Sequence, residues 1–374
     1  MVGAGGGTAV VRDLQADDLP AIAALFASTF RKRRADRVVT PDLLSCLRSI
    51  YLENPWFDPD VASKVFVDEE DRVRGFIGVT AQRMVYGERK LRAALAGSLV
   101  VQDPARHPLA GARLVRSFLN GPQDLSITET ANATAMGMWR KLGVPVNTSY
   151  SLTWLRPLRP AASVAALMML RHSSAHLLAP MAHAADAVFA RISKEALRPS
   201  LEPSPRRLSF SDVDRATFDA AALTLAQRFA LRPDWDAASL DWFSAHAARK
   251  RMVGEPCYRL AVDAQGKPLA AYLWFRREGN IAWLLQSFAG EKQADDLVDD
   301  MLVSAYEYGC AAIRGGTQPW LLNALLRRKA LLLGRSYFLA DARDKSLLAP
   351  IQSGEALVSG LAGETWMRLI GDRF

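Results

Sequence analysis

Cysteine is scarce in this sequence, and the patterns that cysteine-rich proteins use are absent. The 374 residues contain three cysteines, Cys46, Cys257 and Cys310, which lie far apart and form no CxxC pair. Neither a disulfide framework nor a thiolate zinc site is indicated. We therefore expect a protein of the reducing cytoplasm with no bound metal.

Long uncharged apolar runs are also missing. The first residues, MVGAGGGTAVV, have neither the charged start nor the continuous apolar stretch of a secretory signal. The most apolar segment, residues 161–180, carries Arg171, His172 and His176 near its centre, where charged groups would be costly in lipid. We predict no export and no transmembrane span.

The composition is that of a folded globular protein. Half of the residues are hydrophobic and 23% are charged, which argues against disorder, collagen-like repeats and a coiled-coil rod. The length favours two domains. A net charge of +8 favours anionic partners in general. The basic run 31–34 follows the first expected helix, and we interpret it as a solvated helix end, with no nucleic-acid partner.

Periodicity and turn signals predict a mixed α/β unit in the first part of the chain. A strand over 8–14 is followed by a helix capped by Asp17, and Thr40 with Pro41 marks the start of a second helix that runs to Tyr51. A meander of three strands and then an alternation of helix and strand follow, at 64–68, 73–85, 90–102, 108–119, 125–130, 133–142 and 149–155.

Proline-rich segments divide the chain into three parts. We expect an N-terminal domain at 1–157, a helical connector rich in Ala, Leu and Met at 158–204, and a C-terminal domain at 205–374. The connector could alternatively form an apolar wall for an acyl chain or a lipid-like substrate.

The order of elements begins again after the connector, which indicates a tandem repeat. Asp17 and Asp68 match Asp212 and Asp263 at one common offset. The pairs Asn132-Ala133 and Leu142-Gly143 match Asn323-Ala324 and Leu333-Gly334 at an offset that is four residues shorter.

The segment VVQDPARHPLAGARLVRSF, which begins at Val100, joins a strand to a helix through a loop of proline and small residues. Backbone N–H groups at a helix start are unpaired, and small residues let a phosphate approach them. His107, Ala110, Gly111 and Ala112 are the candidate cradle, and Arg113 could add charge. The small residues could equally be a packing device.

The segment NATAMGMWRKLGV, Asn132 to Val144, makes the pattern specific. Together with the strand, loop and helix before it, this segment resembles the GNAT acyl-CoA N-acyltransferase superfamily. The residues that match its motif in register are Asn132, Ala135, Lys141, Leu142 and Gly143. In the preceding loop Pro104 has the family's spacing, whereas His107 stands for Gln or Arg and Ala110 replaces a glycine.

The resemblance implies tandem GNAT-like folds and, in the first, a V-shaped opening between the fourth and fifth strands. An acyl-CoA would lie along the fourth strand, where a backbone N–H polarises the thioester carbonyl. The residues expected to contact it, besides the loop, are Leu99, Val100, Val101, Asn132 and Trp139.

Catalytic groups follow from the same resemblance. Trp139 occupies the position of a tyrosine that protonates the departing thiolate in many family members, and indole has no such acidity. Ser98, Tyr150 and Tyr86 are the possible substitutes. The amine must lose a proton, for which Glu129 on the fifth strand is the first candidate, with Asp103 and Glu88 as alternatives.

The second half has the acidic sequence AGEKQADDLVDD, residues 289–300, where its phosphate loop should lie. Like charges oppose binding of a pyrophosphate, so we predict that this half binds no CoA and is degenerate.

The expected function is that of an acyl-CoA-dependent N-acyltransferase. It would transfer an acyl group, in the first instance acetyl, directly from the thioester to the amine of a small molecule or of a glycan- or lipid-linked acceptor. No cysteine lies in the context of a covalent nucleophile. Two alternatives remain: a catalytically silent acyl-CoA-binding protein, and an aminoacyl transferase, because paired GNAT-like halves also resemble the FemABX group.

Overall fold

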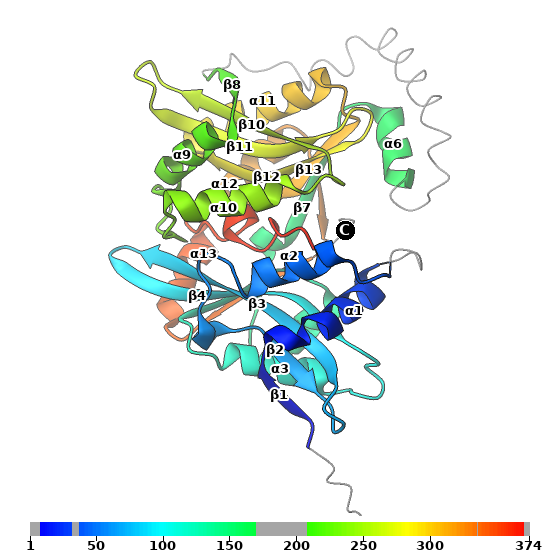
Figure 1. The fold of residues 1–374 in the computed structure, drawn as a ribbon. Helices are drawn as coiled ribbons and strands as arrows, with labels where there is room; N and C mark the ends of the chain where they lie inside the picture. The colour runs from blue at the N-terminus through cyan, green and yellow to red at the C-terminus, as the bar shows by residue number, and fades with distance from the viewer. Residues whose placement is uncertain (1–7, 32–36, 170–207, 335, 370–374) are drawn as a thin grey trace, which may run out of the picture.

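The computed structural model describes residues 8–31, 37–169, 208–334 and 336–369. Two mixed sheets form the centres of the two halves, which lie one above the other in Figure 1. The C-terminal segment, coloured red, runs between them. Of the expected connector at 158–204, the structure describes helix α6 (Pro160–Met169) at its start, and residues 170–204 lie outside the described residues.

The first sheet contains the predicted meander and continues beyond it. Its strand order is β1 (Val10–Asp13), β2 (Lys64–Val67), β3 (Val73–Tyr86), β4 (Arg89–Val101), β5 (Leu125–Ala131), β15 (Tyr337–Ala342) and β6 (Val146–Asn147), and β9 (Leu231–Pro233) pairs with the far end of β3.

Helices cover both faces of this sheet. Successive side chains along a strand point to opposite faces, and both faces carry apolar residues that pack against helices. Phe76 and Val100 face the side of α1 (Leu19–Phe30) and α2 (Pro41–Tyr51), with which they share one core. Ile77 and Ala96 face the opposite side, where α3 (Ala110–Leu119) and α4 (Ala133–Lys141) pack.

The second sheet repeats the strand order of the first. It runs β8 (Phe210–Val213), β10 (Glu255–Val262), β11 (Pro268–Arg276), β12 (Ile281–Ala289), β13 (Ala312–Gly316), β7 (Leu152–Pro157) and β14 (Leu331–Gly334). The helices of this half are α9 (Arg215–Ala226), α10 (Ala237–Ala248), α11 (Ala294–Glu307) and α12 (Pro319–Arg327).

One strand is exchanged between the two sheets. β7 comes from the first part of the chain, yet it lies between β13 and β14 of the second sheet. In return, β15 from the end of the chain lies between β5 and β6 of the first sheet. The expected division at residue 157 therefore coincides with the end of a strand that belongs to the second sheet. The division into domains stays a prediction.

Local capping signals explain where the first helices begin. The Thr40 hydroxyl accepts a hydrogen bond from the N–H of Leu43 at 3.2 Å, and α2 runs from Pro41 to Tyr51 as the sequence predicts. The prediction that Asp17 caps α1 is wrong. The N-cap position belongs to Asp18, whose carboxylate pairs with Arg12 at 2.7 Å, and Asp17 lies inside the short turn before it.

Of the residue matches between the two halves, one pairs residues in equivalent structural positions and another does not. Asp68 and Asp263 each follow the second strand of their half, and each accepts from the N–H groups two and four residues later. By contrast, Asn132 caps α4 whereas Asn323 lies inside α12, and Gly334 ends a strand. The second pairing of residues is therefore not an equivalence.

The segment after β15 joins the two halves into one hydrophobic core. It forms α13 (Ala349–Ser353) and a short turn at Gly360–Ala362, and its Leu361 and Trp366 are buried among residues of both halves. Trp366 packs against Phe243 of α10 at a ring distance of 4.9 Å.

The described residues contain neither a membrane-spanning helix nor a cluster of metal-binding side chains. No helix there has both the length and the apolar character that crossing a bilayer requires. The same residues gather no group of three or more His, Cys, Asp or Glu side chains that could hold a metal ion.

Candidate functional site

The first sheet opens between its fourth and fifth strands. β4 and β5 are parallel and pair only from Ala93 with Leu125 to Leu95 with Ile127. Beyond these pairs the strands separate, so the edge of β4 that faces β5 is not used by a neighbouring strand. On the other edge, the register with β3 shifts by one residue next to Gly97. Ser98 lies at this bulge with a φ of 53°.

A small cavity of about 70 Å³ occupies the gap. It brings together five residues that the sequence singled out: Ser98, Leu99, Asn132, Ala135 and Trp139. Its other walls are Phe30, Ile77, Ala96, Gly97, Thr128, Thr130, Ala131 and Glu364.

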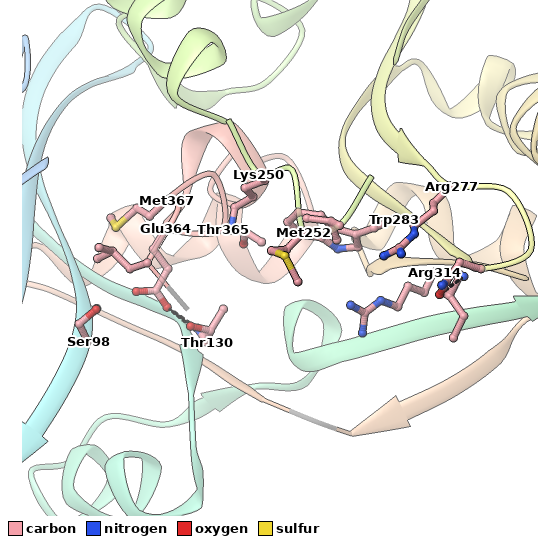
Figure 2. Close-up of a pocket in the computed structure, with 15 residues that line it drawn as sticks. Ser98, Thr130, Lys250, Met252, Arg277, Trp283, Arg314, Glu364, Thr365 and Met367 are labelled. Carbon is pink, nitrogen blue, oxygen red and sulfur yellow. Dashed lines mark hydrogen bonds between the residues drawn. The ribbon is translucent and has the colours of Figure 1, made fainter. Parts of the chain in front are cut away.

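A second cavity of about 600 Å³ lies between the two halves (Figure 2). The two cavities share Gly97, Ser98, Thr130 and Glu364. The walls that the second cavity does not share come from the second half and from the C-terminal segment: Lys250, Met252, Val253, Arg277, Asn280, Ile281, Trp283, Arg314, Thr365, Met367 and Leu369.

Glu364 is the acidic residue at the junction of the two cavities. One carboxylate oxygen accepts hydrogen bonds from the N–H of Thr130, at 2.6 Å, and from the Thr130 hydroxyl. The other oxygen lies above Gly97, where an added Cβ would be 2.6 Å away. Burial, together with the nearby charge of Glu129, raises the pKa of Glu364 to about 7, although the Thr130 hydrogen bonds act in the opposite direction.

Sequence reasoning missed Glu364, and no local signal could have found it. Its neighbours in the chain form no motif, and its partner Thr130 lies 234 residues earlier. Only the course of the C-terminal segment between the two halves places this carboxylate beside β4 and β5.

Glu129, the expected base, has a different environment. Its carboxylate accepts hydrogen bonds from the N–H groups of Gly360 at 3.0 Å, Glu364 at 2.8 Å and Thr365 at 3.1 Å. Burial raises its pKa, and these three donors partly offset the shift. Glu129 is not among the residues that line either cavity. In this position it anchors the loop that carries Glu364.

Of the three hydroxyl candidates, Ser98 lines the two cavities, whereas Tyr86 and Tyr150 line neither. The Tyr150 phenol donates to the carbonyl of Ala356 at 3.0 Å inside the core, burial raises its pKa, and it lines neither cavity. Ser98 lines both cavities, and its Oγ accepts a hydrogen bond from the phenol of Tyr51 at 3.2 Å. Tyr51, at the end of α2, was missed because nothing in its surrounding sequence points to Ser98.

The start of α3 leaves main-chain donors unused by the helix itself. Its first hydrogen bond between residues four apart runs from the N–H of Arg113 to the carbonyl of Leu109 at 2.9 Å, so the N–H groups of Gly111 and Ala112 precede this ladder. The N–H of Ala110 donates to the carbonyl of His107 at 3.1 Å. The loop therefore has the open helix start that the sequence predicts.

The side chains of this loop point to other partners. The guanidinium of Arg113 donates to the carbonyl of Ala9 at 2.7 Å and covers the ring of Phe66, against which His107 also packs. Gly111 lies against Met138 of α4, whose Cε would be 2.8 Å from an added Cβ. Its small size thus serves helix packing, the alternative that the sequence left open, and its role toward a cofactor stays a prediction.

The remaining predicted contacts lie on β4 and α4. Val100 is buried in the core under α1 and α2, and Val101 pairs with Gly75 of β3. Trp139 is buried, with its ring 5.6 Å from that of Phe118. The indole is therefore mainly a core residue with one edge on the gap.

The acidic helix of the second half is engaged in ion pairs. Asp295 and Asp299 of α11 pair with Arg328, the residue that follows α12, and the Asp299 pair has a distance of 2.7 Å. Asp300 pairs with Arg259 of β10 at 2.9 Å. The carboxylates are thus partly neutralised, and repulsion is weaker than the sequence suggests. That this half binds no CoA stays a prediction.

The sequence matches no protein-family model and no curated protein. Solved structures do match, and two of them are crystal structures of GCN5-related N-acetyltransferases. That from Anabaena variabilis ATCC 29413 has 12% identity and a TM-score of 0.56 over 89% of this chain and 72% of its own. That from Kribbella flavida has 13% identity and a TM-score of 0.53 over 91% and 72%.

A third match is a conserved protein of unknown function from Enterococcus faecalis V583, described as a probable N-acyltransferase. It has 11% identity and a TM-score of 0.58 over 91% of this chain and 74% of its own. At identities this low, the likeness concerns the fold. The predicted mixed α/β fold with two GNAT-like sheets is confirmed.

Proposed function

We propose that this chain, which has the fold of the GCN5-related N-acetyltransferases, transfers an acyl group from an acyl-CoA thioester directly to an amine. One observation carries the proposal. The gap between β4 and β5 leads into a larger cavity, and a buried carboxylate with a pKa near neutrality, that of Glu364, lies where they meet. A thioester in the gap would face an amine in the cavity across this carboxylate.

The main chain of β4 is suited to activate the thioester. Beyond Leu95 the edge of β4 toward β5 has no neighbouring strand, and the bulge at Ser98 reorients the peptide groups there. A fixed N–H dipole directed at a carbonyl oxygen stabilises the charge that develops during acyl transfer.

Glu364 is the proposed general base. The amine nitrogen attacks the carbonyl carbon, an N–C bond forms, the C–S bond breaks, and the proton lost by the amine passes to the carboxylate. Thr130 holds one oxygen of Glu364 through two hydrogen bonds, which fixes the orientation of the other. A base with a pKa near the working pH is the efficient choice.

Ser98 is the proposed partner of the departing thiolate. Because its oxygen accepts from the Tyr51 phenol, its own proton can be donated elsewhere. A hydrogen bond suffices, since a thiolate is already a stable anion near neutral pH. This assignment takes the place of Trp139 and Tyr150.

A short acyl group, with acetyl as the first expectation, fits the gap best. The gap has a volume of about 70 Å³, far smaller than the cavity of about 600 Å³ beside it.

The test is thiol release by the full-length protein from acetyl-CoA in the presence of a panel of amines, with the N-acyl product identified by mass. We expect E364Q to lower kcat by about 10²- to 10⁴-fold. E88Q, which removes an exposed carboxylate from the β3–β4 turn, should leave kcat unchanged. CoA binding is measured in parallel by isothermal titration.

Three results would contradict the proposal. Absence of CoA binding would remove its basis. Binding without thiol release or product would make the chain a silent acyl-CoA-binding protein. Transfer that requires aminoacyl-tRNA in place of acyl-CoA would assign the FemABX-like activity.

A further inference from the structure

The larger cavity carries charge of opposite sign at its two ends. Glu364 lies at one end, near Ser98 and Thr130 of the first half (Figure 2). Arg277 and Arg314 of the second half lie at the other end, with Trp283 and Met252 among the residues drawn between them and Glu364. A ligand that spans this cavity meets a carboxylate first and guanidinium groups last.

The second sheet fixes the position of the cationic end. Arg314 of β13 and Trp283 of β12 are register partners in a parallel pair, so their side chains leave the same face of the sheet. Arg277 follows β11 in the turn that leads to β12, and this turn is closed by a hydrogen bond from the N–H of Asn280 to the Arg277 carbonyl at 3.1 Å. Arg277 thus lies just after the end of β11 and Arg314 lies within β13, the two strands that flank β12.

The lining as a whole is cationic. Among the described residues that line it, Glu364 is the one acid, against Lys250, Arg277 and Arg314. Lys250 lies 5.4 Å from the centre of the Trp283 ring and is drawn between Glu364 and the arginines in Figure 2. Glu278, the acidic neighbour of Arg277 in sequence, packs against Gly309 and is not part of the lining. The second half therefore presents a positive surface to whatever enters.

Guanidinium groups recognise planar or tetrahedral oxyanions through paired, charge-assisted hydrogen bonds. The wall between the two ends contains the apolar surfaces of Trp283 and Met252, which suit the carbon skeleton of a ligand better than a second charge. Charge, shape and wall chemistry together specify a ligand with an amine at one end and an anion at the other.

We propose that the acceptor is an amine that carries an oxyanion, a carboxylate or a phosphate, at its far end. Arg277 and Arg314 hold the oxyanion, Trp283 and Met252 flank the intervening chain, and the amine is delivered to Glu364. This inference rests on the proposed function and adds the class of acceptor to it. It also gives the second half a task, the recognition of the acceptor.

The test compares amines of matched length that differ at the far end. The probes are pentylamine, 5-aminopentanoate and 4-aminobutylphosphonate, each with a homologue three carbons longer, assayed with acetyl-CoA. We expect at least one anionic amine to have a kcat/KM that is about tenfold or more above that of the neutral amine of the same length. Preference for the carboxylate or for the phosphonate identifies the kind of oxyanion.

Variants assign the preference to the arginines. R277Q and R314Q should each raise KM for the preferred anionic amine about tenfold, with kcat little changed and pentylamine unaffected. R251Q is the matched control, because Arg251 is exposed, stands in sequence between the lining residues Lys250 and Met252, and lines neither cavity. Isothermal titration of the same amines into the CoA-loaded protein measures recognition independently of turnover.

The outcomes separate the two proposals. If pentylamine is acylated as efficiently as both anionic amines, and binds as tightly, the acceptor class is wrong and the acyltransferase assignment stands. The same holds if R277Q and R314Q leave the anionic preference intact. If an anionic amine binds through the arginines but no amine is acylated, recognition stands and the acyltransferase assignment fails.

Discussion

Glu129 and Glu364 hold each other's main chain. The Glu129 carboxylate accepts the N–H of Glu364 at 2.8 Å, and the Glu364 carboxylate accepts the N–H of Thr130, the residue after Glu129, at 2.6 Å. β5 and the C-terminal segment are thereby joined in both directions at the place where the proposed chemistry occurs. Two carboxylates are brought close together, and they have different tasks.

The pH dependence of transfer should report the ionisation of Glu364. Because its pKa is raised to about 7, the fraction in the basic form grows as the pH rises through that value, and kcat/KM should rise with it and then level off. An aromatic amine with a pKa below about 6 keeps the acceptor unprotonated during the titration. The same rising limb in E364Q would show that another group titrates.

E129Q should shift the rise of kcat/KM with pH to lower pH values. The charge of Glu129 is one of the causes that raise the pKa of Glu364, so its removal favours the ionised form of the base. The pH profile of kcat/KM in E129Q measures the shift directly. A limb at the wild-type position would mean that the two carboxylates do not interact.

E129A should destabilise the protein as well. The substitution removes the acceptor of three main-chain N–H groups in the 360–365 loop. An unsatisfied buried donor costs about 1–3 kcal/mol, so we expect a loss of about 2 kcal/mol or more in the free energy of unfolding, measured with urea. E355Q, at an exposed carboxylate in the same part of the chain, is the control and should change stability by less than about 0.5 kcal/mol.

G97A should impair catalysis through Glu364. The new Cβ would lie 2.6 Å from the Glu364 carboxylate, which must then move from its place above β4. A 1 Å displacement of a catalytic group can cost about 10²-fold in rate, and we expect kcat to fall by that order. The matched control is G137A on α4, where an added Cβ meets nothing within 4 Å. It should keep full activity and raise stability by up to about 1 kcal/mol.

Separate halves should not fold. A fragment of residues 1–157 lacks β15, which lies between its β5 and β6, and a fragment of residues 205–374 lacks β7. Each would leave the edges of two strands unpaired within its sheet. We expect co-expressed fragments to purify as a complex and each single fragment to show no cooperative unfolding by circular dichroism. Cooperative unfolding of either fragment alone would be the contrary result.

Features encoded in a few adjacent residues were predictable from the sequence. Thr40 and Pro41 define the start of α2 because a hydroxyl and a proline have fixed roles at a helix start. Asn132 likewise caps α4, accepting the N–H of Ala135 at 2.9 Å. The motif around it led to the fold, since its spacing reflects a strand, a loop and a helix that are consecutive in the chain.

Features that depend on distant partners were not predictable. The carboxylate of Glu364 is held by Thr130, which lies far from it in the chain, and the hydrogen bond to Ser98 comes from Tyr51 in a different element. Glu129 lies on β5, where the sequence predicted it, but it lines neither cavity, and no local pattern reveals that a loop 231 residues later would enclose it. The exchange of β7 and β15 could not be predicted from the sequence either. The two strands occupy equivalent positions in the two sheets, so either strand would complete the strand order of either sheet.

The exchanged strands determine how the two halves can move. α5 (Thr148–Ser151) leads from β6 in the first sheet straight into β7 in the second, so the crossing has almost no slack. A hinge rotation of one half against the other would shear β7 from between β13 and β14 and break hydrogen bonds on both of its edges. If the proposed transfer takes place in this cavity, we expect ligands to enter and leave through rearrangement of loops and side chains, with little change in the spacing of the two sheets.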